Sequence, residues 1–356
     1  MCFYSRATRA ALCPELPAVT VSTTGSTDTN DLELLERLAQ ARHALAEQIS
    51  RRIVGQSDVV DGLVTALLSG GHVVLIGVPG LAKTLLVQTL AQALDLSFSR
   101  VQFTPDLMPS DITGTELMEE ESGTGKRTFR FVPGPVFGNM VLADEINRAP
   151  PKTQAAMLEA MQEQRVTVLG KAFKLESPFM VLATQNPVEQ EGTYPLPEAQ
   201  LDRFMSLIEL DYPNEAEEIQ IARTTTGDDL VELNHLMTAE QIIAHQNLVR
   251  RVPVPEHIYS YAARLVRMTR PTGSTSPEWL RPLVAWGAGP RAVQSLILGA
   301  KARAALQGSY MVRLEDVKHV APAVLTHRII TTFAAQAERF SAKDIVKRLV
   351  TEFADG

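Results

Sequence analysis

Residues 73–84 have the sequence VVLIGVPGLAKT, in which a short apolar run gives way to a glycine-containing turn that ends in lysine and threonine. The first four residues are apolar and mostly β-branched, which favours a buried parallel strand over a helix. Gly77 and Gly80 then free the backbone, and a helix is expected to begin near Lys83. This order is typical of a phosphate-binding loop, in which backbone N–H groups and the positive end of a helix hold phosphate oxygens.

The loop predicts a set of nucleotide contacts. Lys83 would reach the outer phosphates, and Thr84 would ligate Mg²⁺. Ala82 stands where the pattern G-x-x-x-x-G-K-[ST] expects its second glycine, and its Cβ is expected to narrow the loop and weaken nucleotide binding. Taken alone, the pattern also fits a strand-to-helix turn that holds no ligand. The residues predicted to contact the nucleotide are Gly77, Val78, Pro79, Gly80, Leu81, Ala82, Lys83, Thr84 and Leu85.

A second motif follows about sixty residues later, where an apolar run at 140–143 ends in Asp144 and Glu145. Acids at the carboxyl end of a buried strand lie where a metal-bound phosphate would be held. We predict that Asp144 holds Mg²⁺ through water and that Glu145 orients and deprotonates the attacking water. The alternative is a strand followed by a capping aspartate. The two motifs together, in this order, predict an NTPase.

Composition narrows the class of protein. The chain has 356 residues and is 45% hydrophobic, which favours two domains. Its net charge of -7 argues against a dominant DNA or RNA surface. The two cysteines, Cys2 and Cys13, offer no disulfide framework or cysteine zinc site and indicate a reducing, cytoplasmic setting. No apolar stretch approaches bilayer length, so no membrane span is expected.

Patterning divides the chain into three parts. Residues 1–30 are rich in Ser, Thr, Pro and Gly and are predicted to be a disordered leader. Residues 31–211 alternate strands and helices, which predicts an α/β nucleotide-binding core with a parallel sheet covered on both faces. Residues 212–356 are predicted to be almost wholly helical. Two β-hairpins are expected within the core, near 115–132 and 165–175.

With these pieces in order, the chain resembles the MoxR family of AAA+ ATPases over roughly residues 31–350. The resemblance implies an AAA+ P-loop core with β-hairpin insertions, followed by an all-α lid domain. The resemblance includes Ala82, because an alanine at this position looks like the family's usual phosphate loop. The stretches that carry the resemblance are GVPGLAKT at 77–84, FTPDLMPSDITGTEL at 103–117, FVPGPVFGN at 131–139, LADEINRAPPKTQAAMLEAMQE at 142–163, ATQNPVEQEGTYPLPEAQLDRF at 183–204 and GPRA at 289–292.

The resemblance assigns two further catalytic residues in the core. Asn186 is similar to the sensor-1 residue that helps to place the lytic water, a task for which an amide offers both donor and acceptor. The alternative is an Asn that caps a turn before Pro187. Arg203 resembles the arginine finger that reaches the γ-phosphate bound by a neighbouring subunit. A plain salt bridge to Asp202 or Glu198 is the alternative for this arginine.

Arg291 also has an argument of its own. Pro290 suits the first position of a helix, and a cation in that first turn opposes the helix dipole unless an anion lies nearby. Arg291 is therefore predicted to be sensor 2, which swings with the lid onto the nucleotide phosphates, although helix-start arginines also occur by chance. By resemblance the two hairpins lie toward the pore of a ring, where Lys126, Arg127 and Lys171 would meet a substrate or simply be solvated.

The resulting hypothesis is a cytoplasmic ATPase that uses ATP and Mg²⁺ and assembles as a ring, expected to be a hexamer. By resemblance, its work is chaperone-like: maturation of a protein complex or insertion of a metal cofactor, with a von Willebrand factor A domain protein as adaptor and a protein client. Two alternatives stay open. One is a nucleic-acid translocase, which the net acidity disfavours, and the other is an ATP-gated scaffold with little turnover, which Ala82 keeps in view.

Overall fold

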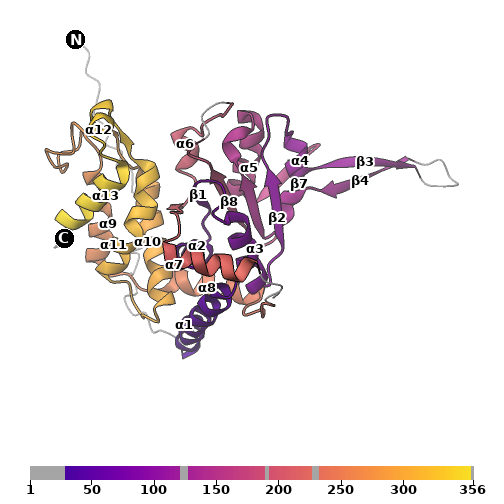
Figure 1. The fold of residues 1–356 in the computed structure, drawn as a ribbon, viewed down its shortest axis with the longest axis horizontal. Coiled ribbons are helices and arrows are strands. Elements are labelled where there is room, and N and C mark those ends of the chain that lie inside the picture. Colours follow the sequence, from indigo (N-terminus) through magenta and orange to yellow (C-terminus); the bar gives the residue numbers. More distant parts are fainter. Residues whose placement is uncertain (1–28, 121–126, 189–191, 227–231, 354–356) are drawn as a thin grey trace, which may run out of the picture.

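The computed structural model describes residues 29–120, 127–188, 192–226 and 232–353. Most of the predicted leader and Lys126 lie outside these ranges. Within them, an α/β part and a mainly helical part lie side by side, and a two-stranded arm extends from the α/β part (Figure 1). The predicted α/β fold with a parallel sheet is therefore confirmed.

A five-stranded parallel sheet is the centre of the α/β part, with strand order β2-β5-β8-β1-β9. The sequence predicts strands near 73–76, 98–103, 140–145 and 180–184, which correspond to four of these five strands. The fifth, at one edge, was not predicted, because it is short and only partly buried. The strands are β1 (Val73–Ile76), β2 (Phe98–Gln102), β5 (Met140–Asp144), β8 (Met180–Gln185) and β9 (Ser206–Glu209).

Helices cover both faces of this sheet, as a wholly apolar central strand requires. Along β1, Val74 packs on one side with α5, whereas Val73 and Leu75 pack on the other with α2 and α3. The helices of the α/β part and of the segment after it are α1 (Thr29–Ser50), α2 (Ser57–Leu68), α3 (Lys83–Ala93), α4 (Pro109–Thr113), α5 (Pro151–Glu163), α6 (Glu198–Leu201), α7 (Glu215–Thr225) and α8 (Ala239–Arg251).

Both predicted hairpins are present. The first pairs β3 (Gly114–Glu120) with β4 (Arg127–Pro133), and it forms the arm that projects from the body in Figure 1. The second pairs β6 (Arg165–Val168) with β7 (Lys171–Lys174). They meet where Phe131 stacks on Phe173 with 4.0 Å between ring centroids. The second hairpin therefore supports the base of the first.

The part that follows is helical, except for one short sheet that was not predicted. In this sheet β10 (Val284–Trp286) pairs antiparallel with β11 (Ile330–Thr331). The helices around it are α9 (Glu256–Met268), α10 (Pro290–Leu306), α11 (Leu314–Leu325), α12 (Phe333–Ala337) and α13 (Ala342–Glu352). None of the described helices has the length and apolar character needed to cross a membrane.

One hydrophobic cluster runs from the sheet through α1, α2 and α8 into α9, α10 and α11. Helix α8 packs on α1 and α2 as well as on α10. The sheet ends at Glu209 and α7 begins at Glu215, on either side of the predicted boundary near residue 211. Since α8 contacts both parts, the exact boundary stays a prediction.

His72, just before β1, is a buried histidine that ties three elements together. Its Nδ1 accepts the Val181 N–H at 3.0 Å, so Nε2 carries the proton and donates to the Met161 carbonyl at 3.2 Å. Burial lowers the pKa of His72 from 6.5 to about 4. Between these values the unfolded chain binds a proton that the folded chain does not, so acidification lowers the free energy of unfolding.

We therefore expect the free energy of unfolding to fall by about 3 kcal/mol through His72 as the pH drops from 6.5 to 4. The variant His72→Asn keeps an acceptor for Val181 and cannot titrate, so it should be less stable at pH 7 but lose less stability on acidification. Urea unfolding at pH 7.5 and pH 5 measures both effects. The exposed His43 on α1 is the control, and equal acid sensitivity of His72→Asn, His43→Asn and the wild type would contradict the account.

Candidate active site

The phosphate loop occupies residues 77–82, between the end of β1 and the start of α3. Gly80 has φ +90, and a Cβ placed there would meet no atom within 4 Å. The loop therefore presents open backbone at this point. A Cβ at Gly77, by contrast, would lie 3.1 Å from Cβ of Leu210 and 3.2 Å from Cδ1 of Leu81. Gly77 is thus needed for close packing, whereas the backbone at Gly80 borders open space.

Ala82 precedes the first residue of α3 with φ 54 and ψ 26, in the left-handed region. This is the backbone that a glycine adopts at no steric cost, whereas a residue with a Cβ adopts it at a cost of about 1 kcal/mol. The side chain of Ala82 is exposed. Alanine therefore keeps the loop conformation expected of the missing glycine, and the weakening of nucleotide binding expected from its Cβ is tested by the variants described below.

Lys83 begins α3 and bends back over the loop, where its Nζ donates to the Gly77 carbonyl at 2.6 Å. Burial lowers the pKa of Lys83, and the carboxylates of Asp144 and Glu145 oppose that shift. The ammonium group is thus held beside the loop and within the field of the two acids. Thr84 follows it in the first turn of the same helix and is half-buried.

Asp144 ends β5 and is buried, with both carboxylate oxygens engaged. Thr184 Oγ1 donates to Oδ1 at 2.6 Å. Arg100 donates to Oδ2 from Nε at 3.0 Å and from Nη2 at 2.6 Å. The carboxylate is therefore held in a fixed orientation by groups from the two neighbouring strands, β8 and β2. Any divalent cation held by Asp144 would share this carboxylate with Arg100 and Thr184.

Glu145 directly follows β5 and has φ 55, which is unusual for a residue with a side chain. The Glu145 N–H donates to Thr184 Oγ1 at 2.8 Å. Its Oε2 accepts from Gln102 Nε2 at 2.7 Å and from Arg148 Nη1 at 3.0 Å. The sharp turn thus directs the carboxylate across the edge of the sheet. Both donors contact Oε2, and an ionised carboxylate has a second acceptor oxygen, Oε1, that can accept from a water molecule.

Asn186 follows β8, between the ends of β5 and β1, and is buried. Its Oδ1 accepts the Val188 N–H at 3.1 Å, which is the local turn contact considered as the alternative role. That contact uses the amide oxygen and leaves the NH₂ group as the donor for a ligand or water. The turn contact and the predicted sensor role are therefore compatible.

The edge formed by these residues fits a nucleotide with its metal. Open backbone at Gly80, a cation at Lys83 and the start of α3 suit phosphate oxygens. Among the described residues, no group of three or more His, Cys, Asp or Glu side chains is placed to hold a metal ion. Mg²⁺ commonly takes one or two protein ligands and otherwise water and phosphate, which is the role that Thr84 and Asp144 fit.

Arg203 lies at the opposite end of the strands, where the parallel strands begin. It precedes β9, whose first residue Ser206 pairs with Val73 at the start of β1, whereas the phosphate loop follows the end of β1. The side chain is exposed, and its Nη1 donates to the Leu158 carbonyl at 3.5 Å. Among the described residues, no ion pair joins it to Asp202 or Glu198. The salt bridge considered as the alternative is therefore not formed.

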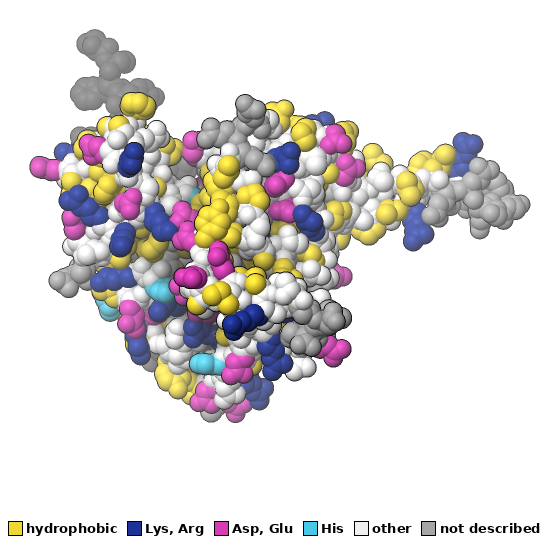
Figure 2. All heavy atoms as spheres, viewed as in Figure 1, with side chains coloured by type: hydrophobic (Ala, Val, Ile, Leu, Met, Phe, Trp, Pro, Cys, Tyr) yellow, Lys and Arg dark blue, Asp and Glu magenta, His cyan; other side chains and the backbone are white. Residues whose placement is uncertain are grey.

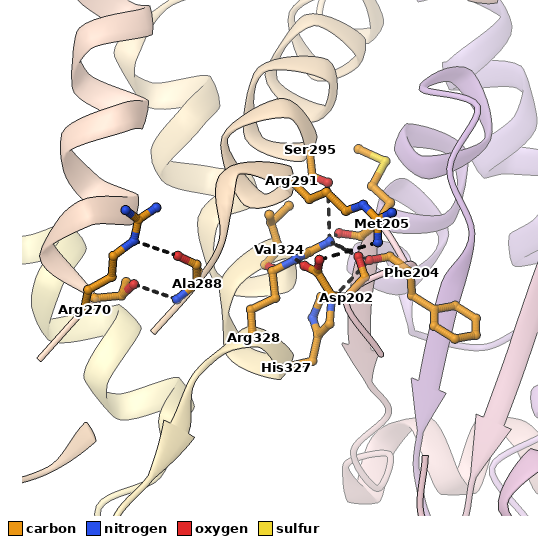
Figure 3. A network of polar contacts seen from close by, with 11 residues as sticks. Asp202, Phe204, Met205, Arg270, Ala288, Arg291, Ser295, Val324, His327 and Arg328 are labelled. Carbon is orange, nitrogen blue, oxygen red and sulfur yellow. Dashed lines mark hydrogen bonds and ion pairs between the residues drawn. The ribbon is translucent and has the colours of Figure 1, made fainter. Parts of the chain in front are cut away.

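Arg291 and Arg203 line the same hollow, and Figure 3 shows Arg291 close to Asp202. It occupies the first turn of α10, as predicted, and its Nη1 is 3.7 Å from Oδ2 of Asp202. Asp202 is thus the anion that offsets the unfavourable position of Arg291 at a helix start. The structure brings Lys83, Thr84, Asp144, Glu145 and Asn186 together at one edge and places Arg203 and Arg291 together at the other.

Four residues of the site were not predicted. Arg100 and Gln102 lie on β2, Thr184 lies on β8, and Arg148 follows Glu145 by one turn. The sequence contained two signals for them. The polar residue Gln102 ends β2, and Thr184 lies near the end of the otherwise apolar strand β8. Parallel strands end at a shared edge, so both positions lie near Asp144 once the strand order is known.

Comparisons with known proteins match both the α/β part and the helical part of the chain. A model of the ATPase family associated with various cellular activities (AAA) matches residues 72–206, and a model of the AAA lid domain matches residues 279–349. Chaperone MoxR1 of Mycobacterium tuberculosis is 41% identical over 318 residues, which cover 88% of this chain and 83% of that protein. Protein MoxR of Methylorubrum extorquens is 31% identical over 299 residues, which cover 79% of this chain and 85% of that protein.

A solved structure extends the comparison to three dimensions. A protein from Cytophaga hutchinsonii assigned as an ATPase superposes with a TM-score of 0.81 at 40% sequence identity. The match covers 89% of this chain and 96% of that one. It therefore includes both the α/β part and the helical part.

The exposed Cβ of Ala82 leads to a prediction for nucleotide binding. The variant Ala82→Gly should bind ATP within about threefold of the wild type, because the loop already has the glycine conformation. The variant Ala82→Val should bind at least about tenfold more weakly, because a β-branched residue is strongly disfavoured at positive φ. Titration calorimetry with a slowly hydrolysed ATP analogue measures both. Binding that is tenfold tighter in Ala82→Gly would show instead that the Cβ obstructs the loop.

Proposed function

Because the chain belongs to the MoxR family of AAA+ ATPases, and is therefore an ATPase, we propose that its catalytic site is completed between two copies arranged in a ring. One observation supports this proposal: the charged residues predicted for the site are divided between the carboxyl and the amino ends of the strands of one sheet. The phosphate loop and both acids lie at the carboxyl edge, and Arg203 and Arg291 lie at the amino edge.

The separation follows from the geometry of β1. Four residues of extended strand span about 10 Å between the two edges. Within one chain, the arginines therefore lie at the far end of the strand from Lys83 and Glu145. A head-to-tail contact between identical copies places one edge of a subunit against a different surface of the next, and it closes into a ring when the rotation allows. Such a contact would bring Arg203 and Arg291 to the neighbour's nucleotide.

Each residue then has a defined task. The loop N–H groups and Lys83 would hold the phosphates, and Thr84 and Asp144 would hold the metal ion. Mg²⁺, when bound, would neutralise charge on the phosphate oxygens. Glu145 orients a water and accepts its proton, with Asn186 as a second contact to that water or to phosphate. Arg203 and Arg291 of the next copy stabilise the charge that grows on the transferred phosphate.

We infer that the ATPase cycle does chaperone-like work on a protein client. The relative from Mycobacterium tuberculosis is named a chaperone. The arm formed by β3 and β4 also exposes Leu117, Met118 and Phe129, next to the basic residues Arg127 and Arg130 (Figure 2). Exposed apolar side chains on a projecting element suit contact with protein rather than with a phosphate backbone.

The finer functions are proposals of the same kind. We propose that the ring acts in the cytoplasm, with a von Willebrand factor A domain protein as adaptor, in maturation of a protein complex or insertion of a metal cofactor. A hexamer is the expected ring. A scaffold that binds ATP but turns it over very little is the alternative, and the rate of phosphate release separates the two.

The shared-site proposal predicts complementation between inactive variants. Glu145→Gln should bind ATP and stall, and Arg203→Ala should fail to activate its neighbour, so each alone should release phosphate at least about a hundredfold more slowly than the wild type. Mixed in equal amounts and allowed to exchange, they should recover activity. About one quarter of randomly formed boundaries would join an intact Glu145 to an intact Arg203.

The matched control is a mixture of Glu145→Gln with Lys83→Ala, in which both changes lie at the same edge. Every subunit of that mixture lacks either Lys83 or Glu145 at its own nucleotide site, so no boundary should recover. Recovery in the control, or none in the first mixture despite shared assemblies seen by native mass spectrometry, would refute the shared site. A wild type that binds ATP without Glu145-dependent phosphate release would favour the scaffold.

A further inference from the structure

Arg328 is the last residue of the 3-10 turn Thr326–Arg328 in the lid, and its side chain is only 2% exposed. The guanidinium group reaches across to the core segment that leads into β9 (Figure 3). Its Nε donates to Oδ1 of Asp202 at 2.8 Å. Its Nη2 donates to the Phe204 carbonyl at 2.7 Å and its Nη1 to the Met205 carbonyl at 3.1 Å. A lid residue thus holds three residues of the core.

These three residues flank Arg203. The Asp202 carbonyl also accepts from Nη2 of Arg328, at 3.2 Å. The Phe204 carbonyl is 3.2 Å from Nε2 of His327, which must donate to it. Burial and the adjacent Arg328 lower the pKa of His327 to about 3, so this histidine is neutral near pH 7. The backbone on both sides of Arg203 is therefore fixed by two consecutive lid residues.

The same guanidinium group also contacts the two lid helices around it. Its Nη2 lies 3.4 Å from Oγ of Ser295, which is one turn after Arg291 on α10. Its Nη1 donates to the carbonyl of Val324 on α11. One planar cation therefore connects the segment that carries Arg203 with the helix that carries Arg291. Only arginine offers five donors in a fixed plane for such a set of acceptors.

Asp202 contacts two arginines that differ in distance from it and in exposure to solvent. Arg328 binds Oδ1 at 2.8 Å and is buried, whereas Arg291 lies 3.7 Å from Oδ2 and its side chain is 49% exposed. The longer, solvent-exposed contact is the weaker of the two. Arg291 can therefore leave Asp202 for a stronger anion while Arg328 keeps the carboxylate in place.

The surface around Arg203 and Arg291 suits a phosphate group. A hollow of about 170 Å³ is lined by Asp202, Arg203, Arg291 and Arg328. Three guanidinium groups and one carboxylate give it two excess positive charges. Since Arg328 is buried beneath it, the arginines that can contact a ligand directly are Arg203 and Arg291.

We propose that Arg328 is a positioning residue that fixes Arg203 and Arg291 as one unit toward the nucleotide of the neighbouring copy. The inference rests on the proposed shared site. It assigns Arg328 no contact with nucleotide of its own chain or of the next. Movement of the lid is thereby transmitted to Arg203, since the segment around Arg203 is bound to the lid as well as to the sheet.

The test is Arg328→Lys, which keeps the charge but cannot reach all of these acceptors. The variant should lower kcat for ATP by at least about tenfold and leave KM and ATP-analogue affinity within about twofold, because its own phosphate loop is intact. Mixing it with Glu145→Gln should restore activity, because Glu145→Gln subunits supply intact arginines to Arg328→Lys subunits. A residue that merely stabilises its own chain would show no such rescue.

Two variants accompany the test. Arg303→Lys is the control, because Arg303 pairs with Asp316 inside the lid and does not contact the segment at 202–205; its turnover should match the wild type. Asp202→Asn is the second test, should Arg328→Lys not fold. It keeps the shape of the side chain and removes the charge shared by the two arginines, so it should also lose kcat and be rescued by Glu145→Gln.

The outcomes separate the two proposals. Wild-type turnover in Arg328→Lys would overturn the inference, as would a parallel loss of ATP-analogue affinity with no rescue by Glu145→Gln. If Arg203→Ala is rescued by Glu145→Gln while neither Arg328→Lys nor Asp202→Asn is rescued, the shared site stands and the role of Arg328 is wrong. If Arg203→Ala itself is not rescued, both proposals fail.

Discussion

The parallel register between β5 and β8 is the constraint on which the site depends. It aligns Val141 with Val181 and Ala143 with Ala183, so the two strands end together. Thr184 can then hold Oδ1 of Asp144 and the backbone N–H of Glu145 with the same hydroxyl oxygen. A shift of one residue would turn Thr184 to the other face of the sheet. The orientation of both acids thus follows from strand pairing.

The lid is joined to the core by two kinds of contact. Apolar packing is continuous from α1 and α2 into the lid helices and is not directional, so it tolerates small rotations. The contacts of Arg328 are directional, and a buried guanidinium group that lost its carboxylate would be costly. The packing therefore stabilises the lid against the core, and Arg328 fixes its register near Arg203.

Much of this organisation was predictable from the sequence where the chemistry lies in adjacent residues. The phosphate loop, the acids at 144–145 and the two hairpins each occupy one short stretch, so local pattern was sufficient. The partners of those residues were not predictable in the same way. Arg100 meets Asp144 across 44 positions, and Arg328 meets Asp202 across 126, so each pair depends on the tertiary fold.

For Arg291, the position in the fold was predictable from the sequence, but the partner was not. Its place in the first turn of a helix follows from Pro290, and the need for a nearby anion follows from the helix dipole. That anion is Asp202 in this structure, but the sequence favoured nucleotide phosphate. The short strand β9 was missed for a related reason, because an edge strand is covered on fewer sides and needs fewer apolar residues.

If one chain lacks a complete catalytic site, as we propose, its turnover must depend on assembly, and dilution of the protein shows whether it does. Phosphate release per chain should be measured over a wide range of protein concentration at saturating ATP and Mg²⁺, with assembly mass recorded at each point. We expect turnover per chain to collapse when the mass falls to that of a single chain and to return on reassembly. Constant turnover per chain in the monomeric range would contradict it.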